Sequence, residues 1–374
     1  MALVKFGDVV RDVKINVDRD NNQYEHYVAG DHMSSEDLTI RNKGCFATDD
    51  VGPAFIRIFK PGQVLYGSRR TYLKKIAVAD FEGVCANTTF VLEVKDNNRF
   101  LQELLPFVML SNDFTSWSIA HSKGSTNPYV LFSDLASFEF DLPSLVEQKV
   151  LAEKLWAAYR LKESYKRLLA ATDEMVKSRF IEMFGTIDEP KVEVKKMIDV
   201  VLSSGQYGSN TSATDYKQDK PRYIRITDIN DDGSLNDDIK TAEVIEDKYK
   251  LIPGDLVFAR TGATVGKTYL HESGDAIYAG YLIKYQMNES LMRPAFMKAF
   301  THSKIYYNWV ANSQKVGAQP NISATQYDNM PVLVPQIEMQ DEFLAIYHQA
   351  DKSKFELRKS IEAIDAVIKS LINN

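Results

Sequence analysis

The sequence has few of the residues from which disulfide-stapled folds and metal sites are built. Its 374 residues include only two cysteines, Cys45 and Cys85, and neither has a second cysteine or a histidine close to it. This scarcity excludes a disulfide-stapled chain and indicates free thiols in a reducing compartment. The six histidines lack the spacing of metal ligands, so the sequence predicts no metal site.

Long apolar runs and an excess of basic residues are also missing. No stretch approaches the ~18 apolar residues of a membrane span, and the N-terminus lacks the apolar segment of a signal peptide. We therefore expect a soluble, cytoplasmic protein without a membrane partner. The 45 basic and 51 acidic residues give a formal net charge of −6. That charge argues at first against nucleic-acid binding, because phosphate contacts need lysine and arginine.

An internal repeat with an offset of 192 residues organises the chain. The segment 60–66 matches 252–258, and each contains a Pro-Gly turn followed by apolar residues. Three further pairs keep the same offset: Pro128 and Pro320, Pro143 and Pro335, and Gln148 and Gln340. A constant offset over so long a stretch indicates that one unit has been duplicated.

Each half ends in a long stretch rich in alanine, leucine, glutamate and lysine. No glycine or proline occurs between Pro143 and Gly185, or between Pro335 and the last residue. Both stretches predict helices of roughly 35 to 40 residues. Apolar residues recur at alternating steps of four and three, as in a coiled-coil seam. The expected helix-pairing residues are Leu151, Leu155, Tyr165, Leu169 and Val176 in the first helix, and Phe343, Tyr347, Leu357, Ile361, Ile364 and Ile368 in the second.

The shared register of the two stripes favours pairing between the helices. A single amphipathic stripe would be assigned to burial against its own domain, but here two helices follow two copies of one domain. Lys162 and Lys354 fall on equivalent seam positions, where a polar residue costs stability and can fix register. If the helices run antiparallel, they form a rod of about 50 Å with a globular domain at each end.

The expected fold class is α+β, with two pseudo-symmetric globular α+β domains separated by two long antiparallel coiled-coil helices. Apolar runs predict strands at 81–94, 255–259 and 276–287, and short helices at 100–111 and 293–312. The expected boundaries are 1–144 for the first globular domain, 145–184 for the first spacer helix, 185–335 for the second globular domain and 336–374 for the second spacer helix.

One segment resembles a nucleotide site without meeting its requirements. In 262–268, three residues separate the two glycines, whereas a P-loop needs four so that its backbone N–H groups can encircle a phosphate. Tyr269 and Leu270, which follow, indicate a strand rather than a helix. No other catalytic pattern is assembled, so we expect a non-catalytic chain.

Positive charge gathers in two windows that contain no acidic residue. The window 57–75 holds six basic residues, and 290–327 holds four interleaved with aromatic residues. Their glycine-containing loops, with the loop at 121–127, offer basic side chains for phosphates or guanine, and amides for adenine. The candidate DNA-binding residues are Arg57, Lys60, Ser68, Arg69, Arg70, Lys74, Lys123, Ser125 and Asn127 in the first half, and Arg260, Thr261, Lys267, Lys304, Gln314, Lys315 and Gln319 in the second.

Together these features resemble the specificity (S) subunits of Type I restriction-modification enzymes. The resemblance rests on Pro-Gly-Asp-Leu-Val-Phe-Ala-Arg-Thr-Gly-Ala-Thr-Val-Gly-Lys at 253–267, Gln-Pro-Asn-Ile-Ser at 319–323, and the Leu-Pro-x-x-x-Glu-Gln entry to the first long helix at 142–148. The first half departs from these patterns, with Gly-Ser-Arg-Arg at 67–70 and Ser-Thr-Asn-Pro at 125–128.

The resemblance implies that each half is a target recognition domain for one part of a split double-stranded DNA site, with the helices fixing the gap. It implies two methyltransferase (M) subunits that bring S-adenosylmethionine and restriction (R) subunits that use ATP and Mg²⁺, with no cofactor in this chain. Because the halves have diverged, we expect an asymmetric target. Three alternatives stay open: the S component of a related modification system without Type I cleavage, a DNA-independent duplicated scaffold, and a nucleotide-binding enzyme.

Overall fold

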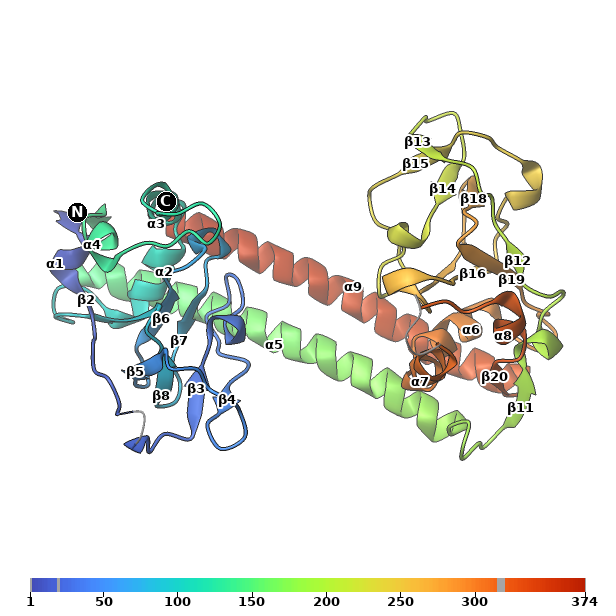
Figure 1. Cartoon of the computed structure of the whole chain (residues 1–374), viewed down its shortest axis with the longest axis horizontal. Coiled ribbons are helices and arrows are strands. Elements are labelled where there is room, and N and C mark those ends of the chain that lie inside the picture. Colours follow the sequence, from blue (N-terminus) through green and yellow to red (C-terminus); the bar gives the residue numbers. More distant parts are fainter. Residues whose placement is uncertain (1, 19–20, 315–319, 374) are drawn as a thin grey trace. The chain divides into compact units, whose positions relative to one another are not determined.

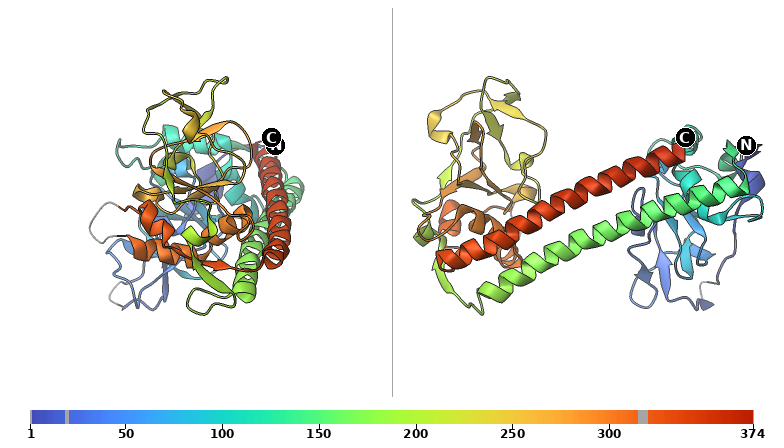
Figure 2. Two further views of the ribbon diagram at one scale, coloured as in Figure 1. Left: turned by 90° about the vertical axis from the view of Figure 1, so that its right-hand side faces the viewer. Right: turned by 180° about the vertical axis from the view of Figure 1, so that it is seen from behind.

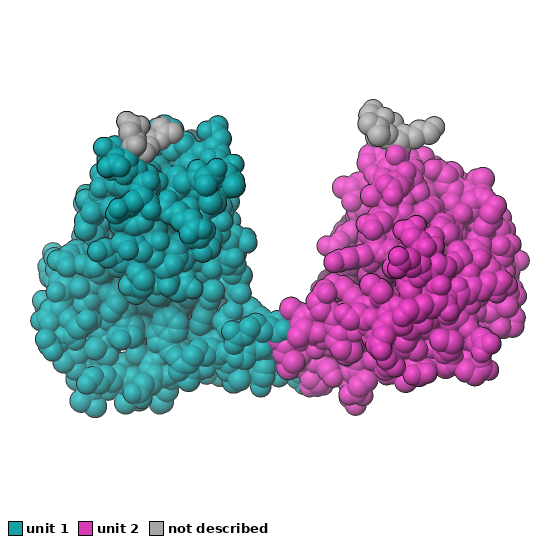
Figure 3. Space-filling model, turned by 90° about the horizontal axis from the view of Figure 1, so that it is seen from below, with its two compact units in different colours: residues 1–167, 358–374 teal, residues 168–357 magenta. Residues whose placement is uncertain are grey.

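The chain consists of two compact units. The computed structural model describes residues 2–18, 21–314 and 320–373. Unit 1 comprises 1–167 and 358–374, and unit 2 comprises 168–357; Figure 3 colours them separately. Each unit therefore contains a globular domain together with a segment of each long helix. The boundaries expected from the sequence instead placed each helix in a segment separate from the globular domains.

The two long helices are unbroken. Helix α5 spans Leu145–Phe184 and α9 spans Ile337–Asn373, and both views of Figure 2 show them as continuous ribbons. A capping box starts α5: the Ser144 hydroxyl accepts from the Glu147 N–H at 3.4 Å, and the Glu147 carboxylate accepts from the Ser144 N–H at 2.9 Å. The long helices that the sequence predicts are confirmed.

Within unit 1, the segments of α5 and α9 pack against each other and run antiparallel. Leu155 and Leu371 line one cavity, and one heptad further along α5 the Lys162 ammonium donates to Asp365 at 2.5 Å. Leu155 and Ile368 are both buried in the core of this unit. As the numbers rise along α5, those of the facing residues fall along α9, which establishes the antiparallel direction.

Unit 2 repeats this pairing with its own segments. The Phe180 and Phe343 rings lie 5.3 Å apart, and Lys354 donates to Asp173 at 3.1 Å. Both members of this ion pair are offset by 192 residues from those of the pair in unit 1. The α+β class with long antiparallel helices is therefore confirmed.

The long helices also bury apolar residues against the globular domains, and Leu155 of the first stripe shares one buried core with Leu104 and Leu105. The Trp156 ring packs edge-on against Phe107 at 5.1 Å, and Trp156 donates its N–H to the Glu103 carbonyl. In unit 2, Phe180 stacks on Phe296 at 5.6 Å. The sequence analysis weighed pairing between the two helices against burial of each helix on its own domain. In the structure both occur together.

The described residues of unit 1 form three small sheets. Figure 1 shows short helices beside these strands. Its strands are β1 (Ala2–Lys5), β2 (Val10–Asp12), β3 (His26–Val28), β4 (Gly44–Cys45), β5 (Phe55–Phe59), β6 (Val64–Gly67), β7 (Ile76–Val78), β8 (Gly83–Ala86), β9 (Thr89–Val94) and β10 (Glu139–Leu142). Its short helices are α1 (Phe6–Val9), α2 (Leu105–Leu110), α3 (Asn112–Ala120) and α4 (Phe132–Ala136). The sheet orders are β2-β9-β6-β7, β4-β3-β8-β5 and β1-β10.

Unit 2 repeats two of these three sheets, and its second four-stranded sheet has a different order, β13-β15-β14-β18. Its strands are β11 (Glu193–Lys196), β12 (Gln206–Tyr207), β13 (Ala213–Asp215), β14 (Arg222–Ile224), β15 (Lys240–Ala242), β16 (Asp255–Ala259), β17 (Thr268–Leu270), β18 (Ala276–Tyr278), β19 (Leu282–Gln286) and β20 (Pro331–Val334). Its short helices are α6 (Pro294–Thr301), α7 (Lys304–Ser313) and α8 (Ala324–Asp328). The order β12-β19-β16-β17 repeats β2-β9-β6-β7, so the duplication is visible in the topology.

The predicted short elements are present but divided. The strand predicted at 255–259 is β16, whereas 81–94 and 276–287 each form two strands. The helix predicted at 293–312 breaks into α6 and α7, because the Ser303 hydroxyl accepts from the Tyr306 N–H and starts a new helix. The sequence analysis did not predict α3, which Ser111 caps in the same way by accepting a hydrogen bond from a backbone N–H.

A buried glutamine ties each long helix to its globular domain. In unit 2, the Gln340 side-chain oxygen accepts from the Arg293 N–H, and its amide donates to the Leu291 and Pro335 carbonyls, all at 2.8 Å. Gln148 makes the three equivalent bonds in unit 1, at 2.9 to 3.0 Å. Both side chains satisfy backbone groups that would otherwise be buried without partners.

Candidate functional site

In both units, the chain that leaves a central strand pairs with a second loop in the same way. After β6, Arg69 forms a bridge with Tyr129; after β16, Thr261 forms a bridge with Asn321. Both members differ by 192 between the units. We call 67–74 with 121–130 the first loop pair, and 259–264 with 320–323 the second loop pair.

Two backbone hydrogen bonds of the first loop pair have exact counterparts in the second. The Val130 N–H donates to the Ser68 carbonyl at 2.9 Å, and the Ile322 N–H donates to the Arg260 carbonyl at 2.8 Å. Two residues further along each first segment, the Arg70 N–H donates to the Pro128 carbonyl at 2.7 Å and the Gly262 N–H donates to the Pro320 carbonyl at 3.0 Å. The backbone is thus duplicated while the side chains differ, which is how one framework can present two different surfaces.

Arg70 occupies a backbone position that suits glycine. Its φ is 51°, whereas Gly262 at the equivalent position has a φ of 72°. We expect Arg70→Gly to raise the free energy of unfolding by about 0.5 to 1 kcal/mol, because the left-handed conformation costs a non-glycine residue about 1 to 2 kcal/mol, which exceeds the added unfolded-state entropy. Urea denaturation measures the change. Arg69→Gly, at a residue without positive φ, is the matched control and should destabilise; equal destabilisation by both would contradict the assignment.

The first loop pair presents a basic and aromatic surface. Arg69 and Arg70 are exposed, and Lys123 remains half-exposed although it pairs with Asp134 at 3.1 Å. Tyr72 and Tyr129 are 54% and 40% exposed, which is high for aromatic residues. Ser125 and Asn127 are also exposed in this loop pair. The structure therefore brings together five of the predicted residues of the first half: Arg69, Arg70, Lys123, Ser125 and Asn127.

Other predicted residues of the first half serve the unit's own structure. Arg57 is nearly buried and bonds Asp12 at 2.9 Å, and the buried Ser68 hydroxyl donates to the Thr88 carbonyl at 2.6 Å. Lys74 pairs with Glu36 at 2.8 Å. Lys60 is exposed but lies before β6, at the opposite end of that strand from the loop pair. These four residues are therefore not part of the surface that the loop pair presents. Three of them are bonded to partners within unit 1, and Lys60 lies at the other end of the strand.

The second loop pair centres on Arg260. Its guanidinium lies over the Tyr207 ring, 4.7 Å from the centroid, and its Nε donates to Asn321 at 3.4 Å. The Thr261 hydroxyl donates to the Pro320 carbonyl at 3.3 Å. Sequence reasoning missed Tyr207; the glycines on either side of Gln206-Tyr207 were the available indication of a closely packed, specialised strand.

The remaining predicted residues of the second half are dispersed. Lys267 pairs with Asp231 at 2.8 Å and bonds the Ile229 carbonyl. Lys304 is exposed at the start of α7, and the half-exposed Gln314 follows its end. Lys315 and Gln319 lie outside the described residues.

The segment that resembles a P-loop has the wrong local structure for one. A short 3-10 turn at Gly262–Thr264 leads into strand β17 rather than into a helix. The Lys267 ammonium, which would have to reach a phosphate, is already paired with Asp231. Nothing in this geometry forms a phosphate cradle at a helix N-terminus.

Burial shifts the pKa of Cys85 in unit 1 and the pKa of His302 in unit 2. Burial raises the pKa of the Cys85 thiol to about 12, so this cysteine stays protonated at neutral pH and is not an activated nucleophile. Burial lowers the pKa of His302, which favours its neutral form. Within 2–18, 21–314 and 320–373, no cluster of three or more histidine, cysteine or acidic residues is placed to hold a metal ion. The same residues include no helix with the length and apolarity of a membrane span.

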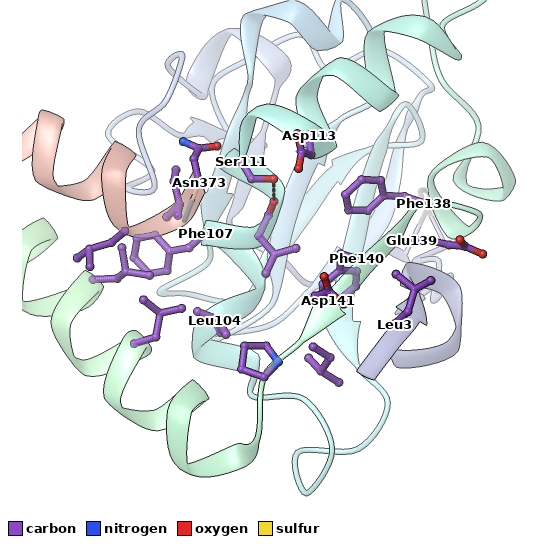
Figure 4. A pocket seen from close by; sticks show the side chains of 17 residues that line it. Leu3, Leu104, Phe107, Ser111, Asp113, Phe138, Glu139, Phe140, Asp141 and Asn373 are labelled. Atoms are coloured by element: carbon purple, nitrogen blue, oxygen red, sulfur yellow. Dashed lines mark hydrogen bonds between the residues drawn. The ribbon is translucent and has the colours of Figure 1, made fainter. Parts of the chain in front are cut away.

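Unit 1 also contains a cavity of about 380 Å³, shown in Figure 4. Leu104 and Phe107 form part of its apolar wall, and Asp113, Glu139 and Asp141 also line it. The Ser111 hydroxyl donates to the Val108 carbonyl at 2.7 Å. The cavity thus combines apolar surface with acidic groups.

Comparison with known proteins points to one family. Residues 56–171, which include the first loop pair and the beginning of α5, match the family model of the Type I restriction modification DNA specificity domain. The EcoDI specificity subunit of Escherichia coli, from a Type I restriction enzyme, is 28% identical over 130 residues, which cover 34% of this chain and 28% of that protein. The EcoBI specificity subunit of E. coli is 22% identical over 317 residues, or 75% of this chain and 65% of that protein. These matches span less than two thirds of either relative.

Solved structures show the same fold. A chain from a structure concerned with complex assembly and conformational transition of the type I R-M system has a TM-score of 0.58 and 18% identity, covering 99% of this chain and 96% of that one. The S subunit of the Type-I restriction-modification system from M. genitalium has a TM-score of 0.58 and 13% identity, covering 99% and 94%. The resemblance stated from the sequence is confirmed, and the fold is that of these proteins.

Proposed function

We propose that this chain, which resembles the specificity subunits of Type I restriction-modification enzymes in sequence and fold, is the DNA-recognition subunit of such an enzyme. Each unit recognises one half-site of a bipartite target on double-stranded DNA. The chain performs no bond-making chemistry itself, and its binding energy positions the subunits that do.

The duplicated loop pairs carry the proposal. Their backbones share one bridge and two equivalent hydrogen bonds. The first nevertheless presents Arg69, Arg70 and Lys123, while the second presents Arg260 with Tyr207 and Asn321. Side chains of these types bind phosphates and the edges of bases. Two similar frameworks with different side chains account for a target of two unlike halves.

The negative net charge is compatible with this function, because basic groups gather locally. Several acidic groups are already neutralised within the fold: Arg225 bonds both Asp228 and Asp238. Arg69 and Arg70, by contrast, are exposed on a segment without acidic residues. The first loop pair therefore presents exposed positive charge although the net charge of the chain is negative.

The partners of the proposed complex bring the chemistry. Two M subunits bind S-adenosylmethionine and methylate adenine, and R subunits use ATP and Mg²⁺ for cleavage. The two long helices set the distance between the half-sites. The related alternative, an S component that acts with M subunits alone, has the same recognition function and differs only in lacking R subunits.

The proposal predicts an asymmetric bipartite methylation motif. We expect adenine methylation in a host carrying the S and M genes to fall within two short, different half-sites separated by a spacer of fixed length. Genome-wide mapping of methylated adenines measures this, with a host lacking the S gene as control. A continuous or palindromic motif would contradict the proposal that each unit binds one half-site.

The scaffold alternative makes a different prediction. A DNA-independent scaffold would bind M subunits, but the complex would not retain one DNA sequence more strongly than another. Salt-dependent retention of motif-bearing DNA by the S–M complex, compared with DNA of scrambled sequence, separates the two functions.

A further inference from the structure

Arg260 is held more firmly than a surface arginine usually is. Its backbone N–H donates to the Tyr281 carbonyl at 3.1 Å, and its carbonyl accepts from the Ile322 N–H at 2.8 Å. Its guanidinium lies over the Tyr207 ring at 4.7 Å, and its Nε donates to Asn321 at 3.4 Å. The backbone of Arg260 and the Nε atom of its side chain are therefore bonded, and its guanidinium rests against a ring.

Tyr207, on which Arg260 rests, is itself fixed. Its hydroxyl accepts from the Ala324 N–H at 3.1 Å, at the beginning of α8, and its backbone pairs with β19 at Ile283. The flanking glycines permit this close packing: a Cβ at Gly208 would lie 2.4 Å from the Ala279 carbonyl oxygen, and one at Gly205 2.5 Å from the Tyr285 hydroxyl. Even so, 43% of Tyr207 is exposed, which is unexpected for an aromatic ring with only a packing role.

The contacts of Arg260 leave one edge of its guanidinium available. The Nε atom donates to Asn321. Neither Nη atom donates a hydrogen bond to a described residue or forms an ion pair with one. Two parallel N–H groups on the end of a planar group match the O6 and N7 acceptors of guanine in the major groove. The attraction between the guanidinium and the Tyr207 ring limits the conformations that the side chain can adopt, so a contact with DNA loses less conformational entropy.

We propose that Arg260 recognises a guanine in the half-site of unit 2, and that Tyr207 and Asn321 are positioning residues that hold its guanidinium for this contact. The inference rests on the proposed function. It also explains part of the expected asymmetry, because the equivalent residue in unit 1 is Ser68, which is buried and bonded to the Thr88 carbonyl. The first loop pair therefore offers no guanidinium at this position.

The experiment compares DNA selected by the S–M complex of the wild type and of variants. A library randomised over both half-sites is retained at fixed salt concentration and sequenced. For Arg260→Ala we expect one guanine position of one half-site to become degenerate, with a loss of preference of about 5- to 150-fold. The other half-site, read by unit 1, is an internal control and stays unchanged.

Further variants separate positioning from a general effect on the fold. Tyr207→Phe keeps the ring and should keep most of the guanine preference, whereas Tyr207→Leu removes the ring and should weaken preference at the same position. Asn321→Ala should act on that position as well. Lys248→Ala, which removes an exposed lysine of unit 2 outside the second loop pair, should leave every position unchanged.

The outcomes distinguish the inference from the function on which it rests. If Arg260→Ala weakens retention equally for all sequences and lowers the salt dependence by about one phosphate contact, Arg260 binds the backbone and the inference is wrong. An unchanged motif in Arg260→Ala would overturn it too. If the wild-type complex selects no bipartite motif, the proposed function itself fails.

Discussion

Replacement of Gln340 by alanine is expected to lower the free energy of unfolding of unit 2 by about 3 kcal/mol. The side chain is completely buried and makes three hydrogen bonds to backbone groups, from the Arg293 N–H and to the Leu291 and Pro335 carbonyls. Alanine would leave these groups buried without partners, at a cost of about 1 to 3 kcal/mol each, reduced where water can enter. Urea denaturation, with hydrogen exchange to locate the destabilised unit, measures the effect.

Two variants serve as controls for this prediction. Gln349→Ala removes an exposed glutamine from the same helix and should change stability by less than about 0.5 kcal/mol. Gln148→Ala removes the equivalent buried glutamine and should destabilise unit 1 by a similar amount, because its three bonds are the same. A loss for Gln340→Ala no larger than that for Gln349→Ala would show that the three bonds do not stabilise the junction.

The repeat and the long helices could be predicted because their signals are local and repeated. Two glycine-free and proline-free stretches with one seam register indicate helices, and a constant offset indicates duplication, without any knowledge of tertiary contacts. The offset also marked Gln148 and Gln340 as equivalent. Their burial could not be inferred, since glutamine is normally a surface residue and only the fold places its amide beside three backbone groups.

The candidate site was harder to predict, because charge composition does not show where a side chain points. Arg57 lies in the basic window of the first half, yet the side chain faces Asp12, which is 45 residues away in the sequence. Tyr207 lies outside both windows, yet β12 brings it beneath Arg260. In both cases a contact between distant segments decides the role of the residue. Sequence patterning identified the loops, and tertiary structure identified the side chains they present.

Insertion of one heptad into both long helices is expected to lengthen the spacer of the DNA target by about three base pairs and to leave both half-sites unchanged. The insertions belong after Leu168 in α5 and at the facing position, after Arg358 in α9. These points fall between the Lys162–Asp365 and Lys354–Asp173 pairs. Seven residues add about 10 Å of helix and nearly two full turns, so the seam stays in phase.

A heptad inserted into α5 alone is the matched control. The partner helix would then lack seven facing residues, so the two ion pairs could not form together, and we expect loss of sequence-specific methylation rather than a new spacer. The measurement is mapping of methylated adenines in three strains: the wild type, the double insertion and the single insertion. One such map gives both the spacer length and the two half-sites. The proposed recognition residues lie in the loop pairs and not in the helices. A double insertion that alters a half-site while keeping the old spacer would therefore refute the proposal that the helices set the spacing.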